Sequence, residues 1–225
     1  MAVGPGGTGT IFWDVDTQVD FMVPGGKLYV PDAAAITANL DRLTRHARER
    51  GIPRVASVDD HTLFDPEISD TPDFRETFPP HCLHGTDGQK KIPATAMASP
   101  VVVPNRPEDP DALRARLRGH RGEILIEKSR FDVFTNPNTG AVLDLLAPAT
   151  IVVYGVAQDV CDAHAIRGFL ERGGASVVFV EDAARPIDAG RGRELLEEWK
   201  RQGVRVIRTG DVLAGELPAA DFPVR

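Results

Sequence analysis

The chain has 225 residues and a formal net charge of −7, a length that fits one large domain. With 42% hydrophobic residues, it can bury a substantial core without disulfides. Its Lys and Arg residues are scattered and its pI is near 5.4, which argues against nucleic-acid binding. No apolar stretch approaches the roughly 18 residues of a membrane span, so we expect neither nucleic-acid nor membrane binding.

The cysteine content and the N-terminus indicate a soluble, cytoplasmic protein. Cys82 and Cys161 are too few for a disulfide framework and form no Cys-x-x-Cys pair. The N-terminus, Met1 to Thr10, is Gly-rich and uncharged, unlike a signal peptide. Its segment Gly4 to Gly9 superficially resembles a dinucleotide-binding loop, but it precedes the first predicted strand instead of following one.

Short β-branched runs alternate with helical patterns. Near-continuous runs such as Ile151-Val152-Val153 are typical of strands buried on both faces of a parallel sheet. The predicted strands are Thr10–Val15, Pro53–Val58, Glu123–Glu127, Thr150–Gly155, Ser176–Val180 and Val204–Ile207. The predicted helices are Ala33–Arg50 behind an Asp32 N-cap, Thr139–Leu146, Asp159–Arg172 and Ala189–Gln202. This alternation predicts a three-layer α/β/α sandwich with a mostly parallel sheet of about six strands.

The segment from His61 to Arg121 breaks this rhythm. It is rich in Pro, Asp, Gly and Thr, and it is too long for an idle loop in a compact domain. We therefore expect residues 61–121 to form an elaborated loop region over the carboxyl edge of the sheet, where open α/β folds place ligands. No linker or internal repeat is apparent, so residues 1–225 are interpreted as one domain.

Cys161 is the candidate nucleophile. It follows a buried run, in the first turn of a helix that we expect Asp159 to cap. There the positive end of the helix dipole favours thiolate, and backbone amides can donate hydrogen bonds to an oxyanion. The alternative is a small buried hydrophobic residue.

A nucleophilic cysteine needs a base. His164 lies three residues further along the same helix, a poor line for proton transfer. Asp16 ends the first strand at the same sheet edge, where burial raises a carboxyl pKa. Lys128 ends another strand at this edge, and its charge would stabilise both a thiolate and an oxyanion.

Asp59, His61 and His81 form a candidate metal site. Asp59 and His61 directly follow a strand with side chains on one side, and His81 lies in a stiff turn after Pro79-Pro80. One carboxylate and two imidazoles suit zinc, manganese or iron(II). The alternative is a set of loop residues that never meet. Cys82 is interpreted as a packed thiol.

Together these segments resemble the isochorismatase-like cysteine hydrolases, and within them the nicotinamidases. Asp16-Thr17-Gln18-Val19-Asp20-Phe21 resembles the family motif whose first Asp is the catalytic base, and Asp59-Asp60-His61 resembles its metal-binding Asp-x-His. The stretch from Phe78 to Gly88 is similar to the one that carries the last metal His. Lys128 stands where the family has its catalytic Lys, and Gly155 to Cys161 resembles the nucleophile stretch.

The resemblance also implies details of the site. A cis peptide is expected between Val156 and Ala157, with the Ala157 and Cys161 amides as oxyanion donors. Two of four phenylalanines are expected to sandwich a flat ring; the candidates are Phe21, Phe78, Phe131 and Phe134. Gln158, Val19 and Asp60 depart from the family pattern, which leaves the catalytic set intact and the substrate open.

The implied activity is deamination of nicotinamide to nicotinate and ammonia through a thioester, a reaction of NAD salvage. A divalent metal, zinc before manganese or iron, would position the small-molecule amide, and a homo-oligomer is expected. The main alternative is a related amidase acting on a ureido, carbamoyl or other small amide, whose relatives generally lack the metal triad. A non-catalytic metal-binding or interaction protein is the alternative of another class.

Overall fold

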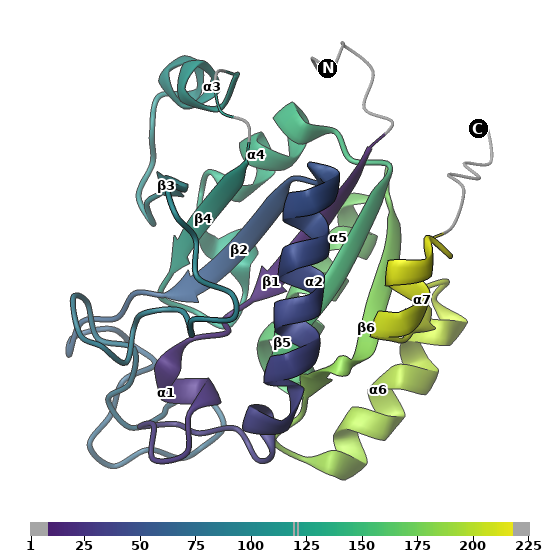
Figure 1. Ribbon diagram of the computed structural model, residues 1–225. Helices are drawn as coiled ribbons and strands as arrows, with labels where there is room; N and C mark the ends of the chain where they lie inside the picture. Colours follow the sequence, from purple (N-terminus) through teal and green to yellow (C-terminus); the bar gives the residue numbers. More distant parts are fainter. Residues whose placement is uncertain (1–8, 119, 121, 218–225) are drawn as a thin grey trace.

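The computed structural model describes residues 9–118, 120 and 122–217, and a seven-stranded sheet lies at its centre (Figure 1). Every strand pair is parallel, in the order β3-β4-β2-β1-β5-β6-β7. The strands are β1 (Thr10–Val15), β2 (Arg54–Asp59), β3 (Val101–Val103), β4 (Glu123–Lys128), β5 (Thr150–Val156), β6 (Ser176–Arg185) and β7 (Arg205–Ile207). The predicted α/β sandwich is confirmed, with one more strand than expected.

Helices cover both faces of the sheet (Figure 1). The α-helices are α1 (Val19–Met22), α2 (Thr37–Arg50), α3 (Pro110–Arg118), α4 (Thr139–Leu146), α5 (Ala163–Arg172), α6 (Ala189–Arg201) and α7 (Thr209–Ala214). Three further helical turns are η1 (Ala33–Ile36), η2 (Val133–Thr135) and η3 (Gln158–Asp162), the last a turn of π-helix.

Two helix starts differ from the prediction. Asp32 adopts a left-handed φ of 58° and its side chain makes no capping hydrogen bond, so η1 precedes α2. Asp159 does not cap a helix either: it lies inside η3, and its carboxylate accepts hydrogen bonds from the distant Ile187 and Asp188 amides. Asp32 thus has a backbone conformation unlike that of an N-cap, and the Asp159 carboxylate is used by amides outside the helix.

The segment 61–121 is not loop throughout. It contributes β3 at one edge of the sheet and α3, whose Leu113 and Leu117 join the core. Residues 61–90 wind around the end of the sheet near α1 (Figure 1). The Gly-rich stretch 4–8 lies outside the described residues. Within the described part of the chain, no helix is long and apolar enough to cross a membrane.

Strand alternation divides the core into two halves. Trp13 on β1 packs edge-on against Phe169 of α5, with ring centroids 4.8 Å apart. Its neighbour Phe12 points to the opposite face, where α2 contributes Leu40 and Leu43. Because central strands are buried on both faces, their sequences are apolar at nearly every position.

The topology brings polar residues to one edge. The strands that follow β1 lie on one side of it up to β4, and β5, β6 and β7 lie on its other side. The strand order therefore reverses between β1 and β5. Ligands in open α/β sheets bind outside the carboxyl ends of the strands at such a switch point. Asp16 follows β1 there, and Asp59 and Lys128 are register partners at the ends of β2 and β4.

Candidate active site

Asp16, Lys128 and Cys161 meet at this edge although they are far apart in the sequence. The Lys128 Nζ lies 2.8 Å from the Asp16 Oδ2 and 3.7 Å from the Cys161 Sγ. The Ser57 hydroxyl donates to the Asp16 Oδ1 at 2.7 Å. Asp16 has a φ of 46°, an uncommon conformation that turns its side chain out of the strand. The structure therefore brings the sequence-predicted catalytic residues together.

Lys128 links this trio to the candidate metal site. It also forms an ion pair with the Asp59 Oδ1. Burial favours a neutral lysine, but Asp16 and Asp59 outweigh it, so the pKa of Lys128 lies well above its usual value. Burial likewise opposes the charge of Asp59, but Lys128 and the two histidines hold the Asp59 pKa well below its usual range. Both side chains are therefore charged.

The thiol of Cys161 is protonated at rest. Burial raises its pKa well above the usual value, Lys128 opposes this shift, and Asp16 and Asp59 add to it. Burial therefore opposes the thiolate that the position near a helix start is expected to favour. Burial also raises the Asp16 pKa, against the opposing effect of Lys128. His164 hydrogen-bonds with Arg167 instead, in keeping with its rejection as the base.

The backbone before Cys161 follows an unusual path. Gly155 has a φ of 138°, and a Cβ there would lie 2.0 Å from the Val15 carbonyl oxygen, so only glycine fits. The next peptide, Val156–Ala157, is cis, as the resemblance implies. The Ala157 carbonyl then accepts hydrogen bonds from the Val160 and Asp162 amides, which closes η3 and places Cys161 in this turn.

Asp59, His61 and His81 also meet. The His61 Nε2 and the His81 Nε2 each lie 3.7 Å from the Asp59 Oδ2. The candidate ligand atoms all fall within 4.8 Å of one another, and the three side chains are buried. Each carboxylate oxygen of Asp59 has its own partner set: Oδ1 faces Lys128, and Oδ2 faces both imidazoles.

These residues fit a divalent metal. Among the described residues, neither buried ring nitrogen of His61 has a hydrogen-bond partner, which is costly unless something binds there. The His81 Nδ1 lies 2.8 Å from the Pro79 carbonyl oxygen, which makes Nδ1 the donor and leaves Nε2 as a free lone pair. Cys82 stays apart from this set as a packed thiol, since it is fully buried and its Sγ contacts the Gly88 carbonyl oxygen at 3.8 Å.

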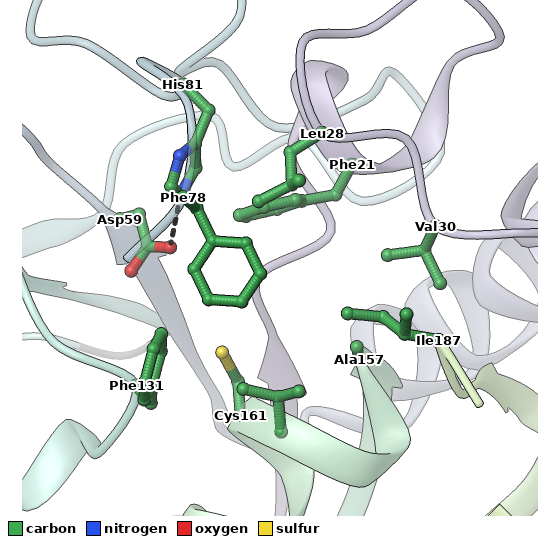
Figure 2. A pocket seen from close by; sticks show the side chains of 11 residues that line it. Phe21, Leu28, Val30, Asp59, Phe78, His81, Phe131, Ala157, Cys161 and Ile187 are labelled. Atoms are coloured by element: carbon green, nitrogen blue, oxygen red, sulfur yellow. Dashed lines mark ion pairs between the residues drawn. The ribbon is translucent and has the colours of Figure 1, made fainter. Parts of the chain in front are cut away.

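A pocket connects Cys161 with Asp59 and His81 (Figure 2). Its empty volume is about 370 Å³, counting the space open to solvent. Phe21, Phe78 and Phe131 line it, with the Phe78 and Phe131 rings at 5.7 Å in an edge-on contact. The fourth candidate, Phe134, does not line it: Phe134 packs on Phe169 and against Gly168, where a Cβ would lie 2.2 Å from its ring.

Three site residues had no role assigned from the sequence. The Gln18 side chain donates to the Asp59 carbonyl oxygen and accepts from the Asp59 amide, so it fixes the backbone of a candidate ligand. The Asp20 carboxylate accepts from the Cys82 amide at 2.7 Å and holds the turn that carries His81. Glu67 is only 2% exposed and accepts from the Phe131 amide at 2.9 Å.

The sequence carried an indication for two of them. Gln18 and Asp20 lie inside the family motif, whereas Glu67 lies in a polar loop without any local pattern.

The isochorismatase domain matches residues 11–211, which include every site residue described above. The chain belongs to the isochorismatase family. Its fold is the isochorismatase-like hydrolase fold. A comparison with curated proteins found no match.

Solved structures of amidases share the fold of this family member. The zinc complex of pyrazinamidase from Pyrococcus horikoshii is 23% identical, with a TM-score of 0.69 over 88% of this chain and 98% of that chain. Nicotinamidase/pyrazinamidase from Bacillus subtilis is 20% identical, with a TM-score of 0.70 over 89% and 100%. N-carbamoylsarcosine amidase from Thermoplasma acidophilum is 23% identical, with a TM-score of 0.68 over 89% and 96%.

Proposed function

We propose that the protein is a cysteine amidase that converts nicotinamide to nicotinate and ammonia. The observation that carries this proposal is the contact between Asp16, Lys128 and Cys161 beside an apolar pocket that ends at Asp59 and His81. The Pyrococcus and Bacillus structures, whose names include pyrazinamidase and nicotinamidase, support it as relatives in fold.

The reaction begins with the neutral thiol. Asp16 accepts the Cys161 proton, and the sulfur forms a bond to the amide carbon. Lys128 stays positively charged beside both groups and stabilises the developing negative charge. The Ala157 and Cys161 amides are the proposed oxyanion donors. The carbon–nitrogen bond breaks as Asp16 returns the proton to nitrogen, and ammonia leaves.

Water completes the cycle. Asp16 takes a proton from water as its oxygen attacks the thioester carbon, and the carbon–sulfur bond breaks. Asp16 gives that proton to the Cys161 thiolate, which restores the thiol, and the carboxylic acid product leaves. A divalent metal held by Asp59, His61 and His81 would supply Lewis acidity for a lone pair of the substrate, such as a pyridine nitrogen. We propose zinc, the metal in the Pyrococcus complex.

The pocket favours a neutral aromatic amide over a ureido acid. Its lining residues, all in the described part of the chain, include no lysine or arginine that would pair with a substrate carboxylate. Three phenylalanine rings supply flat apolar walls instead. The likeness to N-carbamoylsarcosine amidase is one of fold, and we do not propose a ureido acid as the substrate of this chain.

An ammonia-release screen tests the proposal. Nicotinamide, pyrazinamide, benzamide, N-carbamoylsarcosine and a ureido acid are assayed with and without chelator. We expect release from the neutral aromatic amides and its loss with chelator for nicotinamide. Release only from the ureido substrates would make the protein the alternative amidase. No release from any amide, together with metal binding, would favour a non-catalytic metal-binding protein.

The cysteine pair provides a matched control. Cys161→Ala is expected to reduce ammonia release by a factor on the order of 10³ or more, because no other group supplies the nucleophile. Cys82→Ala, which removes the packed thiol, is expected to retain turnover. Substantial turnover by Cys161→Ala would exclude the nucleophile assignment.

A further inference from the structure

We propose that the pocket contains an apolar subsite that binds an alkyl substituent on the ring of an aromatic amide. The subsite is formed by Leu28, Val30, Val160 and Ile187, beside Ala157. This inference rests on the proposed amidase activity and names its substrate class more closely: aryl carboxamides with an apolar group meta to the amide.

The pocket has two chemically different ends. Figure 2 shows Asp59, His81 and Phe131 on one side of the Cys161 sulfur, and Val30 and Ile187 on the other side. The first end offers a carboxylate and an imidazole, which suit a polar or metal-bound edge of a substrate. On the second side Val30 and Ile187 present aliphatic side chains. A substrate that spans both ends therefore needs one polar and one apolar edge.

The walls of the apolar subsite are held in place by backbone hydrogen bonds. The Leu28 amide donates to the Asp20 carbonyl oxygen at 3.2 Å, and the Val30 amide donates to the Phe21 carbonyl oxygen at 2.9 Å. This wall is therefore tied to α1, which also supplies Phe21 to the pocket. A preformed wall binds a substituent without a large ordering cost.

The opposite wall is tied to the nucleophile turn. The two oxygens of Asp159 accept from the Ile187 amide at 2.8 Å and the Asp188 amide at 2.7 Å. One residue earlier, the Gln158 side chain donates to the Gly192 carbonyl oxygen at 2.8 Å. The position of Ile187 is thus fixed relative to Cys161, because both depend on η3.

The exposure of the lining residues differs along the subsite. Val30 is 2% exposed and forms the inner part of the subsite, whereas Ile187 is 44% exposed at its mouth. Burying aliphatic surface is favourable in proportion to the area removed from water. Since this surface is continuous with the pocket at Cys161, part of the same substrate is the occupant that the geometry favours.

The position of the substituent follows from the two ends. With the amide carbon at the Cys161 sulfur and one ring edge toward His81, the other ring edge faces Val30 and Ile187 (Figure 2). A group ortho to the amide would twist the amide out of the ring plane. A meta group on the free edge enters the subsite without disturbing the reacting carbonyl.

A homologous series tests this inference. We compare kcat/KM for benzamide, 3-methylbenzamide, 3-ethylbenzamide and 3-propylbenzamide with the metal-loaded enzyme. Because each buried methylene gains about the free energy of transfer from water, kcat/KM is expected to rise about threefold to fourfold per carbon, chiefly through KM. In Ile187→Ala, 3-propylbenzamide is expected to lose more than benzamide does, so the dependence on chain length flattens.

The control variant is Val102→Ala, which truncates an exposed apolar residue on β3 outside the pocket and is expected to keep the wild-type dependence. A flat or falling series in the wild-type enzyme would overturn the inference, as would an equal loss for all four amides in Ile187→Ala.

Binding separates this inference from the amidase proposal. Dissociation constants of the same four amides are measured by calorimetry with Cys161→Ala, and with Cys161→Ala combined with Ile187→Ala. The subsite is supported if affinity increases with the length of the alkyl chain in Cys161→Ala and no longer does so in the double variant. This result would support it even if no amide is hydrolysed. Equal affinities along the series would reject the subsite even if benzamide and nicotinamide are good substrates.

Discussion

Lys128 is the residue on which the charges of both halves of the site depend. Its Nζ contacts the proposed base Asp16, the candidate metal ligand Asp59 and the Cys161 sulfur. Two carboxylates and a thiol held this closely would repel one another once ionised, and the buried cation compensates that repulsion. The proton that the reaction needs therefore resides on the thiol and moves to Asp16, while Lys128 remains charged.

This assignment predicts the effect of removing the base. Asp16→Asn keeps the size of the side chain but cannot accept the thiol proton, so kcat is expected to fall about 10²- to 10⁴-fold. Ser57→Ala removes only the hydrogen bond to the Asp16 Oδ1 and is expected to cost less than about tenfold. Steady-state ammonia release measures both. Wild-type kcat in Asp16→Asn would assign the base elsewhere.

The buried carboxyl group of Glu67 is expected to make the free energy of unfolding of the metal-free protein depend on pH. Burial raises its pKa from 4.5 to about 7, against the opposing effect of Lys128. The folded protein therefore binds this proton more tightly than the unfolded chain does, and the associated stability is lost as the pH rises from 4.5 to about 7. Glu67→Gln is expected to remove this loss, which amounts to ~1–3 kcal/mol.

Urea unfolding with chelator at a series of pH values measures the difference. The exposed Glu171→Gln is the control and is expected to follow the wild type. If Glu67→Gln shows the wild-type pH dependence, the Glu67 carboxylate is not the group responsible.

At the scale of elements, the close approach of β5 to β1 determines where the nucleophile lies. The two strands are in register up to the pair Val15 and Gly155, directly before Asp16 and the cis peptide. The turn η3 is then joined to the segment after β6 through Asp159 and Gln158. Strand end, nucleophile turn and pocket wall therefore form one connected unit.

Gly155→Ala is expected to disrupt this unit. The new Cβ would lie 2.0 Å from the Val15 carbonyl oxygen at a φ of 138°, so the strands must separate, at a cost of about 3 kcal/mol or more. Gly210→Ala is the matched control, because it lies in α7 with nothing within 4 Å and is expected to be neutral or stabilising by up to ~1 kcal/mol. Urea unfolding measures both, and equal stabilities would contradict the steric argument.

At the scale of the whole molecule, the candidate metal site lies where distant parts of the chain meet, and backbone hydrogen bonds between His61 and the segment 82–84 already join two of them. Asp59 ends β2, His61 follows it, and His81 arrives from a loop that Asp20 holds against α1. A metal bound there would connect the sheet to the loop over its edge. Binding to the folded state alone stabilises it by RT ln(1 + [L]/Kd), about 3 kcal/mol at a metal concentration of 100 times Kd.

Zinc added to the metal-free protein is therefore expected to raise Tm. His61→Ala is expected to abolish the rise, because its buried ring supplies one candidate ligand. His84→Ala, whose side chain is 73% exposed and lies outside the triad, is expected to retain it. Thermal unfolding with elemental analysis provides the measurement. An equal rise in both variants would place the zinc somewhere else.

Much of the fold and of the site was predictable where the pattern is local. The central strands are readable because burial on both faces leaves near-continuous Ile and Val runs. The sequence did not predict the strand Val101-Val102-Val103, because an apolar run of three residues in a Pro-rich region is too short to distinguish a strand from a loop. Phe134, one of four candidates of which two were expected to line the pocket, lies outside it, because its ring packs against Gly168, and its position in the sequence does not reveal this contact.

The sequence by itself determined the fold class and the residue types of the two candidate sites, since each leaves a pattern along the chain. Only the tertiary structure decided the charge states, the donor nitrogen of His81 and the chemistry of the two pocket ends. Those properties depend on burial and on neighbours distant in sequence: Cys161 keeps its proton because it is desolvated beside Asp16 and Asp59, which the helix start alone does not reveal.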